Sequence, residues 1–368
     1  MTNTTERVRE LVERSGGSQR EFAERVGLDN AKMSKSLNGV RRFTSLDLAR
    51  IAEAGGVTVD WLLGADEPAV AMAARAATGT SNARALAEAK RLSDHRADVS
   101  YLGYRQPWRQ VAFAVGSGRY VDQGQRLATA ARTWFERAAV DPLAPDLAGA
   151  VERAFGIDVS VTDLGPAFDG LAVSNDETKL ILVSQSALPW RQRFTIAHEL
   201  AHILAGDDQG VHLDVDVLDR RGDLSEGRAN AFAAALLMPE ETLRNAVGRT
   251  GVDDESFAQL ACRLRVSPSA LAYRLKSMRL VDAGACDRFA SLTAQSAAEI
   301  AGASAAFAAD VAEASRSRPP GLLARDTYAA YIDGKATLRP YANLIGSDVD
   351  SLRVALERDV TETELKQL

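Results

Sequence analysis

Residues 194–204 read Phe-Thr-Ile-Ala-His-Glu-Leu-Ala-His-Ile-Leu, and this stretch governs the interpretation of the chain around it. His198 and His202 are four positions apart, so on a helix both imidazoles lie on one face about one turn apart. Glu199 projects from the same turn. Two imidazoles and a carboxylate inside an apolar run are costly to bury unless those groups bind something. The spacing therefore predicts a helix that holds a metal ion.

Zinc is the metal we expect, because it takes imidazole and carboxylate ligands and, in catalytic sites, keeps a water in the fourth position. The pattern His-Glu-x-x-His supplies two nitrogen ligands and one general base, as in zinc peptidases. The alternative is that His198 and His202 are ordinary buried histidines. We favour the metal because the chain has only four histidines and two of them fall at this spacing around a glutamate.

A third ligand is predicted in residues 223–239, an apolar segment that reads as a helix ending at Pro239. Glu226 lies in its first turn and would complete the ligand set. Asn230, four positions later on the same face, could hydrogen-bond a ligand histidine. The alternative is a capping box between Asp223 and Glu226. The preceding metal-binding pattern favours the ligand interpretation.

The two segments resemble the ImmA/IrrE family of zinc metallopeptidases over roughly residues 120–282. The matching strings are Arg191-Gln-Arg-Phe-Thr-Ile-Ala-His-Glu-Leu-Ala-His202 and Glu226-x-x-Ala-Asn-x-Phe-Ala-x-x-Leu-Leu-Met-Pro239. The resemblance implies that zinc is held by His198, His202 and Glu226, and that Glu199 is catalytic. Arg228 departs from the family pattern, because many relatives carry an acid there; any supporting role of that acid is in doubt.

The activity implied is metal-assisted hydrolysis of a peptide bond. Zinc lowers the pKa of a bound water, and Glu199 takes a proton from it and passes that proton to the leaving amine. A further group should stabilise the oxyanion. His212 and Tyr273 are candidates, and the sequence does not choose between them. His212 lies in a polar segment, residues 207–223, where the ordinary interpretation is a solvated loop histidine.

The first 65 residues carry a separate signal, in which apolar residues recur at helical spacing. Ser18 and Glu21 form a capping box that opens one short helix, Asp29 caps the next, and Asn38-Gly39 closes it. Two short helices joined by a tight turn, inside a bundle of about five, predict a helix-turn-helix.

Residues 6–64 resemble the Cro/C1 (XRE) type of helix-turn-helix. The resemblance is carried by Ser18-Gln-Arg-Glu-Phe-Ala-Glu-Arg-Val-Gly27 and Val59-Asp-Trp-Leu-Leu-Gly64. It implies binding to double-stranded DNA, with the helix over 29–37 in the major groove. The DNA contacts expected from that helix and its flanks are Asn30, Lys32, Ser34 and Lys35, together with Gln19, Arg41 and Arg42 on phosphates.

The alternative is a bundle that binds only protein. Residues 1–65 hold ten Lys+Arg against nine Asp+Glu, so their net charge does not favour DNA, although the local cluster of Lys32, Lys35, Arg41 and Arg42 does. The whole chain carries a net charge of −6, which leaves about −7 on the remainder. The larger part of the chain is therefore not expected to bind DNA electrostatically.

Length and composition set further limits. A chain of 368 residues allows two to three domains. Cys262 and Cys286 form neither a disulfide framework nor a zinc-ribbon spacing. The chain starts with polar and charged residues and contains no apolar run of eighteen, so we expect a cytoplasmic protein with no membrane partner.

We expect a mainly α fold with a small sheet, that is, an α+β class. The predicted domains are a helix-turn-helix domain over 1–65, a linker and connecting helices over 66–119, a zincin-like peptidase domain over 120–282 and a helical C-terminal region over 283–368. Strands are expected at 158–162, 171–173 and 180–184. We expect the last of these to be an edge strand that holds an extended peptide substrate.

Three further expectations concern packing. Tyr101, Tyr104 and Trp108 are expected to pack against a neighbouring element. Residues 253–280 read as a second helix-turn-helix-like unit, expected to pack on the peptidase core rather than on DNA. Residues 285–317 read as one Ala-rich helix that ends at Arg318-Pro-Pro320.

Together these features predict a DNA-binding regulator that carries a zinc-dependent endopeptidase. The resemblance alone implies the setting: cleavage of a protein target, with a repressor as the expected kind, in a stress, mobile-element or toxin–antitoxin response. One alternative is a transcription factor whose zincin-like domain is a non-cleaving sensor or dimerisation module. Another is a protease with a protein-binding N-terminal bundle. A homodimer is expected because helix-turn-helix proteins commonly bind two half-sites.

Overall fold

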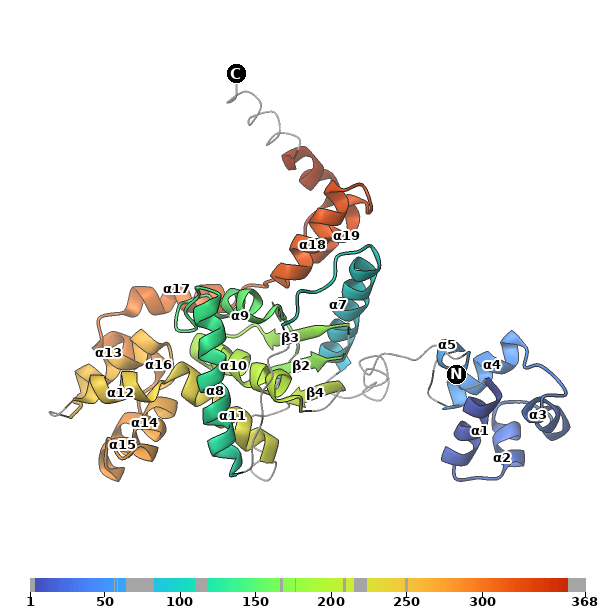
Figure 1. The fold of residues 1–368 in the computed structure, drawn as a ribbon, viewed down its shortest axis with the longest axis horizontal. Coiled ribbons are helices and arrows are strands. Elements are labelled where there is room, and N and C mark those ends of the chain that lie inside the picture. Colours follow the sequence, from blue (N-terminus) through green and yellow to red (C-terminus); the bar gives the residue numbers. More distant parts are fainter. Residues whose placement is uncertain are drawn as a thin grey trace, which may run out of the picture. The chain divides into compact units, whose positions relative to one another are not determined.

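The computed structural model describes residues 4–55, 57, 59–63, 83–109, 118–165, 168–175, 177–207, 210–214, 224–248 and 251–356. This part of the chain is mainly helical and contains one small sheet, which confirms the predicted α+β class (Figure 1). The chain divides into two compact units, Met1–Leu86 and Ala87–Leu368. Within the predicted linker and connecting helices over 66–119, residues 66–82 and 110–117 lie outside the described residues. None of the helices that are described has both the length and the apolar character needed to cross a bilayer.

The first unit is a helical bundle around one apolar core. Its helices are α1 (Thr4–Arg14), α2 (Gln19–Arg25), α3 (Asn30–Leu37), α4 (Ser45–Gly55) and α5 (Val59–Leu62). Val8, Phe22, Met33 and Ile51 are completely or almost completely buried in that core. The predicted capping box of Ser18 and the predicted cap of α3 by Asp29 are both present. Local signals therefore set where α2 and α3 begin.

The sheet belongs to the second unit and has the order β1-β3-β2-β4. Its strands are β1 (Asp158–Thr162), β2 (Gly170–Ser174), β3 (Lys179–Ser184) and β4 (Gly210–Asp214). β3 pairs in parallel with β1 and antiparallel with β2, and β2 pairs antiparallel with β4. The three predicted strands are confirmed, and β4 is an addition that the sequence did not predict.

Two predictions about this sheet were wrong. Residues 180–184 lie in the internal strand β3, not at an edge, and their apolar run Leu-Ile-Leu-Val fits a strand covered on both faces. His212 lies in strand β4, paired with Ala172, rather than in a loop. The polar composition of residues 207–223 concealed this strand, because backbone pairing with β2 does not require apolar side chains.

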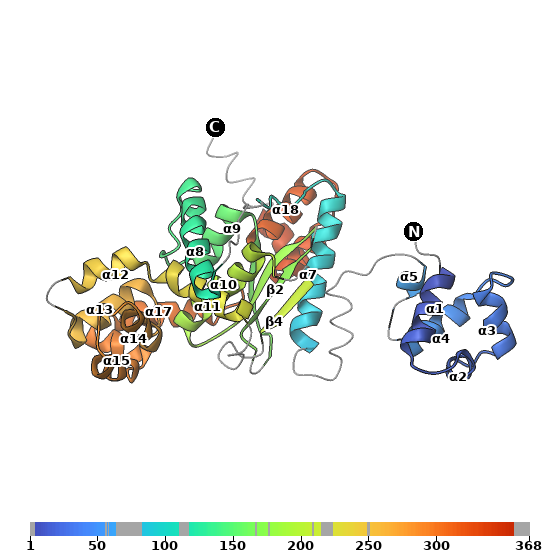
Figure 2. The ribbon, with the colours of Figure 1, turned by 60° about the horizontal axis from the view of Figure 1, so that its bottom comes forward.

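Four helices form the core against the sheet: α8 (Tyr120–Arg137), α9 (Leu147–Phe155), α10 (Pro189–Ala205) and α11 (Leu224–Leu237). α10 contacts both β2 and β3, and α11 packs against α8 and α10 (Figure 2). Pro189 occupies the first turn of α10, where its missing N–H costs nothing, and Gly206 ends the helix with φ +67°. α10 is therefore enclosed between the sheet and α11.

The chain continues through α12 (Glu240–Val247), α13 (Asp254–Leu264), α14 (Pro268–Ser277), α15 (Ala283–Ala290), α16 (Ala294–Ile300), α17 (Ser304–Ala314), α18 (Gly321–Ile332) and α19 (Leu338–Ile345). Phe257 of α13 stacks on Phe289 of α15, and Leu271 of α14 belongs to the same core as the residues of α10. The α13–α14 unit thus packs on the core, as expected.

The prediction of one helix over residues 285–317 was wrong, because this segment forms α15, α16 and α17. Asp282 and Thr293 cap the first two of these helices, and Gly302 adopts φ +65° before the third. A run rich in alanine has high helix propensity throughout, so the caps and the glycine decide where each helix ends.

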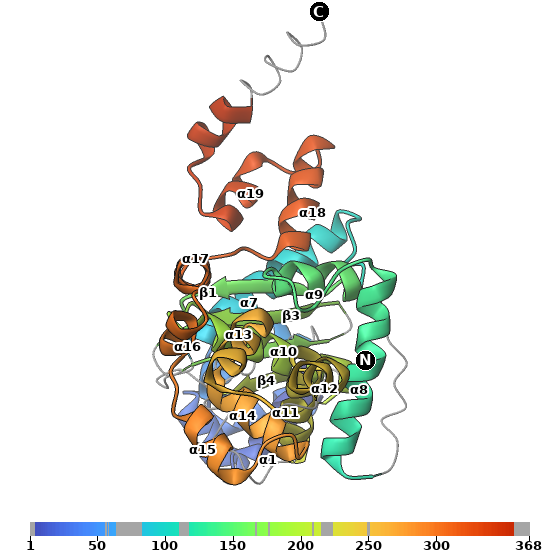
Figure 3. The ribbon, with the colours of Figure 1, turned by 90° about the vertical axis from the view of Figure 1, so that its left-hand side faces the viewer.

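Helix α7 (Ala83–Tyr101) and the C-terminal region are tied to β1 by buried charges. Arg96 of α7 forms ion pairs with Asp158 of β1 at 2.6 Å and with Asp326 of α18 at 2.7 Å, and α18 contacts β1 (Figure 3). Burial raises the pKa of Asp158 to about 6, although Arg96 opposes the shift. Arg318, just before α18, bridges Val161 of β1 through two backbone hydrogen bonds.

The three aromatic residues expected to pack behave differently. Tyr101, at the end of α7, is 92% exposed, so its predicted packing was wrong. Tyr104 donates a hydrogen bond to Asp333. Trp108 lies under the ammonium group of Lys179, at 5.5 Å from its ring centre. Tyr104 and Trp108 thus contact neighbouring elements as expected.

Candidate metal centre

Helix α10 presents His198, Glu199 and His202 to the interior of the second unit. The two histidines are one turn apart, and their ring centres are 4.9 Å apart. All three side chains are at most 1% exposed, because α10 is covered by the sheet on one side and by α11 on another. The local sequence makes the helix, and the packing of α10 places its polar residues out of contact with water.

Helix α11 brings Glu226 to the same point. Its Oε2 lies 3.2 Å from Nε2 of His198, and its Oε1 lies 3.5 Å from Nε2 of His202. The two Nε2 atoms are 3.1 Å apart. The structure therefore brings together the three residues predicted as ligands, with one donor atom from each within 4.8 Å of the others.

The outer nitrogens of the two rings indicate which atoms point inward as donors to a metal. Nδ1 of His198 lies 3.1 Å from Oδ1 of Asn230, and Nδ1 of His202 lies 3.3 Å from Oδ2 of Asp207. An imidazole nitrogen that faces an acceptor oxygen carries the proton. Both Nε2 atoms then present lone pairs toward each other and toward a carboxylate. Two imidazole nitrogens and one carboxylate oxygen form a donor set that fits zinc.

Asn230 occupies the position expected of it, whereas Asp207 was not identified from the sequence. Asp207 follows Gly206, whose left-handed conformation turns the chain back so that the Asp207 N–H donates to the carbonyl of His202 at 3.2 Å. Arg228 of α11 forms an ion pair with the other oxygen of Asp207. The sequence signal for Asp207 was an acid one residue beyond the helix-ending glycine that follows His202.

Glu199 points toward the start of β2. A Cβ atom added to Gly170 would lie 3.4 Å from Oε1 of Glu199 and 2.7 Å from Cγ2 of Thr195. Only a glycine at the start of β2 allows α10 to approach this closely. The Glu199 carboxylate thus lies against the start of β2.

Tyr273 lies on α14 and is 60% exposed. The backbone of His212 lies in β4, and its side chain is outside what the structure describes. Asp223 also lies outside the described residues, so the alternative capping box with Glu226 stays untested.

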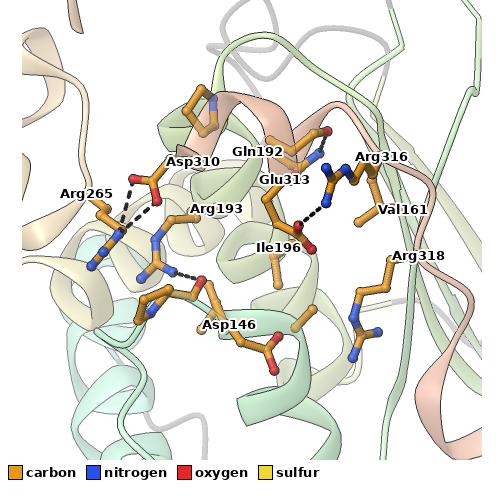
Figure 4. A pocket seen from close by; sticks show the side chains of 15 residues that line it. Asp146, Val161, Gln192, Arg193, Ile196, Arg265, Asp310, Glu313, Arg316 and Arg318 are labelled. Atoms are coloured by element: carbon orange, nitrogen blue, oxygen red, sulfur yellow. Dashed lines mark hydrogen bonds and ion pairs between the residues drawn. The ribbon is translucent and has the colours of Figure 1, made fainter. Parts of the chain in front are cut away.

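Two cavities border the first half of α10. The larger, of about 470 Å³, is lined by Gln192, Arg193 and Ile196 of α10 and by side chains from α9 and α17 (Figure 4). Arg193 donates to the carbonyls of residues 142, 144 and 145, and burial lowers its pKa to about 10. The smaller, of about 270 Å³, includes Thr195, one turn before Glu199. His198, Glu199, His202 and Glu226 line neither cavity.

In the first unit, helix α3 turns one polar face outward. Asn30, Lys32 and Lys35 are exposed and Ser34 is partly exposed, whereas Met33 is completely buried on the opposite face. Gln19, at the start of α2, donates to Oδ1 of Asn30 at 3.2 Å. The residues predicted to contact bases therefore share one surface.

The two arginines expected to bind phosphates differ in their surroundings. Arg42 is exposed, but Arg41 forms an ion pair with the largely buried Asp47 at 2.7 Å and donates to Ser36. Burial alone would raise the pKa of Asp47, but hydrogen bonds from Thr44 and Arg41 outweigh it and hold that pKa below its ordinary value. Arg41 therefore already holds the start of α4 in place.

Residues 152–276 match the family model Peptidase_M78, described as the IrrE N-terminal-like domain. The chain is 39% identical over 127 residues to the radiation response metalloprotease IrrE of Deinococcus radiodurans. The aligned segment covers 33% of this chain and 37% of that protein. It is also 39% identical over 103 residues to the protein of the same name from Deinococcus deserti. That aligned segment covers 27% of this chain and 36% of the relative.

The chain thus spans little more than a third of the length of these curated relatives. The predicted resemblance to ImmA/IrrE proteins is confirmed for the central part of the chain, which includes α10 with His198 and His202 and α11 with Glu226. The resemblance of residues 6–64 to the XRE type stays a prediction.

Proposed function

We propose that the second unit is a zinc-dependent endopeptidase in which zinc is held by His198, His202 and Glu226. The observation that carries this proposal is the convergence of two imidazole nitrogens and one carboxylate, from two separate helices, in a buried place. A zinc ion held there supplies Lewis acidity, which polarises a scissile carbonyl and lowers the pKa of water.

Glu199 is the general base in this proposal. It follows His198 directly on α10 and is 1% exposed, so its carboxylate acts in a site from which bulk water is excluded. It receives the proton of the attacking water and delivers that proton to the leaving amine. Asn230 and Asp207 hold the two histidine rings in the orientation that directs Nε2 inward.

We propose that β4 holds the substrate as an added strand. β4 pairs with β2 on one side, and no strand of the described residues pairs with its other side. An extended peptide there would gain backbone hydrogen bonds without any requirement for a particular sequence. Residues 180–184 were expected from the sequence to bind the substrate, but these residues lie in the internal strand β3, so we assign substrate binding to β4.

The substrate we propose is a protein, and a repressor is the target that best fits the rest of the chain. Two of the relatives are named radiation response metalloproteases, which favours a stress response over a mobile-element or toxin–antitoxin setting. A protease and a DNA-binding unit in one chain would act at a raised local concentration on a DNA-bound target.

We propose that the first unit binds double-stranded DNA, with α3 in the major groove. The exposed Asn30, Lys32 and Lys35 and the bond between Gln19 and Asn30 support this proposal. The Asn30 amide is thereby held at the start of α3, where recognition helices contact base edges. Binding as a homodimer to two half-sites is part of the proposal.

One observation favours a second candidate function. His198, Glu199, His202 and Glu226 are all at most 2% exposed, so a peptide reaches them only if part of their cover moves. A domain that binds zinc but does not open would act as a non-cleaving sensor or dimerisation module of a transcription factor.

A single variant distinguishes the two functions. Glu199→Gln should keep one zinc per chain but lose cleavage, and Glu241→Gln, an exposed acid on α12, is the matched control. Cells that express each form after DNA damage should be compared by mass spectrometry of protein N-termini. New N-termini that appear with the wild type and with Glu241→Gln, but not with Glu199→Gln, support the peptidase. Identical N-termini and identical transcription in all three would establish the non-cleaving module.

The metal itself has a direct test. Purified wild-type protein should contain about one zinc per chain, and His198→Ala should contain almost none. A wild-type protein that binds no zinc from zinc-containing buffer would refute the proposed zinc site.

DNA binding by the first unit is tested by selection from random DNA duplexes at two salt concentrations. A DNA-binding protein should retain less duplex at the higher salt concentration.

A further inference from the structure

We propose that Asp207 and Arg228 act together as a charged pair that positions His202 for zinc. The inference rests on the proposed zinc site but not on cleavage. It assigns a role to an acid in the turn after α10 and to an arginine on α11, neither of which is a ligand. Both act through His202 and are therefore positioning residues.

The backbone brings Asp207 to the histidine. Gly206 has φ +67°, a conformation that other residues rarely adopt, and the N–H of Asp207 then donates to the carbonyl of His202. The side chain returns toward the same residue, so that Oδ2 lies 3.3 Å from Nδ1 of His202. Asp207 thus contacts both the last turn of α10, through its backbone, and the His202 ring, through its side chain.

Arg228 holds the other side of that carboxylate. Its Nη2 contacts Oδ1 of Asp207, so the carboxylate bridges the guanidinium and the imidazole. The Arg228 side chain is 8% exposed and that of Asp207 is 14% exposed. Within the described part of the chain, Arg228 is the cation paired with Asp207 apart from the histidine itself.

Helix α8 fixes the guanidinium from a second direction. Arg228 donates to Oε1 of Gln123 at 3.3 Å and lies 5.4 Å from the ring centre of Tyr120. Gly124 allows this approach, because a Cβ there would lie 2.3 Å from the carbonyl oxygen of Arg228. Because Gln123 and Tyr120 of α8 hold the guanidinium in place, Arg228 keeps the Asp207 carboxylate in one orientation.

The consequence is an asymmetry between the two histidines. His198 is oriented by a neutral amide, Asn230, whereas His202 is oriented by an ion-paired carboxylate. A hydrogen bond to an ionised acceptor is about twice as strong as a neutral one. Loss of the partner that orients a ligand histidine typically weakens metal affinity about 10–100-fold. We therefore expect the loss of Asp207 to weaken zinc affinity more than the loss of Asn230 does.

The test is a double-mutant cycle on the full chain with zinc affinity as its readout. Zinc Kd is measured by competition with a chromophoric chelator for the wild type, Asp207→Ala, Arg228→Ala and the double variant. Asp207→Ala should raise Kd about 10–100-fold. Arg228→Ala should raise it by less, and should add nothing in the Asp207→Ala background, because it acts through that carboxylate.

Matched controls and conservative variants separate positioning from folding. Asp254→Ala and Arg288→Ala break an exposed ion pair of the same unit and should leave Kd within twofold. Asp207→Asn keeps an acceptor oxygen and should fall between the wild type and Asp207→Ala. Circular dichroism of the zinc-free proteins reports whether each variant folds; where alanine does not, Asp207→Asn and Arg228→Lys carry the comparison.

The outcomes are distinct. Unchanged zinc Kd in folded Asp207 variants, or effects of the two substitutions that simply add, would overturn this inference while the proposed function survives. Zinc binding that depends on the pair, in a protein without any cleavage, would support the inference and refute the peptidase. A wild-type chain that binds no zinc overturns both.

Discussion

Oδ1 of Asn230 on α11 lies 3.1 Å from Nδ1 of His198 on α10. Two helices separated by the strand β4 in the sequence are thus joined by a polar contact directly beside the predicted metal ligands. Glu226 and Asn230 are four residues apart on α11, so one helical face supplies both a predicted ligand and a residue that contacts another predicted ligand. The geometry of the centre depends on the contact between α10 and α11.

Asn230→Ala should weaken zinc binding without preventing it. The His198 ring would lose the acceptor of its Nδ1 proton, so we expect Kd for zinc to rise about tenfold, the lower end of the range for such partners. Chelator competition measures the change. Asn245→Ala, an exposed amide on α12, is the control. Equal zinc Kd in Asn230→Ala and Asn245→Ala would show that the contact does not support the ligand.

Gly170→Ala should destabilise the second unit and disturb Glu199. The added Cβ would lie 2.7 Å from Cγ2 of Thr195 and 3.0 Å from the carbonyl oxygen of Leu182, so α10 must move away from the sheet. Overpacking of this kind costs about 1–3 kcal/mol in the free energy of unfolding, measured by chemical denaturation.

Two companion variants make this prediction specific. Thr195→Ser removes Cγ2 and should restore part of the stability lost in Gly170→Ala. Gly284→Ala, on α15, meets its nearest atom at 3.6 Å and should be tolerated. A Gly170→Ala protein as stable as Gly284→Ala would contradict the close approach of β2 and α10.

Arg41→Ala and Arg42→Ala should have different effects. Arg42 is exposed, so its loss should leave the thermal midpoint unchanged and reduce the salt dependence of duplex binding by about one unit of slope. Arg41 neutralises the largely buried Asp47, so its loss should lower the thermal midpoint of the first unit. Differential scanning calorimetry and salt titrations of duplex binding measure both. The reverse assignment of the two effects would refute this division of roles.

Asp158 should make the stability of the second unit fall as pH rises. Burial raises its pKa in the folded protein from an ordinary 3.8 to about 6. The folded state therefore binds a proton more tightly than the unfolded state, and the stabilisation is fully present below pH 3.8 and lost as pH rises through about 6. A shift of two pKa units corresponds to about 3 kcal/mol.

Asp158→Asn does not titrate and isolates this effect. Relative to the variant, the thermal midpoint of the wild type should decrease between about pH 4 and pH 7. Asp287→Asn, an exposed acid on α15, should follow the wild type at every pH. A constant difference between the wild type and Asp158→Asn across this range would show that the ion pair with Arg96 keeps Asp158 ionised throughout.

Local sequence determined the parts of this protein that depend on spacing along the chain. The positions of His198, Glu199 and His202 on one helix follow from the period of the helix, and the starts of α2 and α3 follow from Ser18 and Asp29, whose side chains bond to N–H groups two or three residues away. The strands β2 and β3 were predictable because each contains an apolar run, and β1 was predictable because polar and apolar residues alternate along it.

Tertiary structure decided what depends on partners distant in sequence. β4 forms by pairing with the edge of β2 that β3 leaves open. β3 is internal because β1 and β2 pair with its two sides. The composition of β3 or β4 alone does not predict either position. Asp207 reaches His202 through the turn at Gly206, and the packing of α11 then places Arg228 against the other oxygen of that carboxylate. The sequence alone therefore predicted the ligands, and only the packing of α10, α11 and α8 determined which residues contact them.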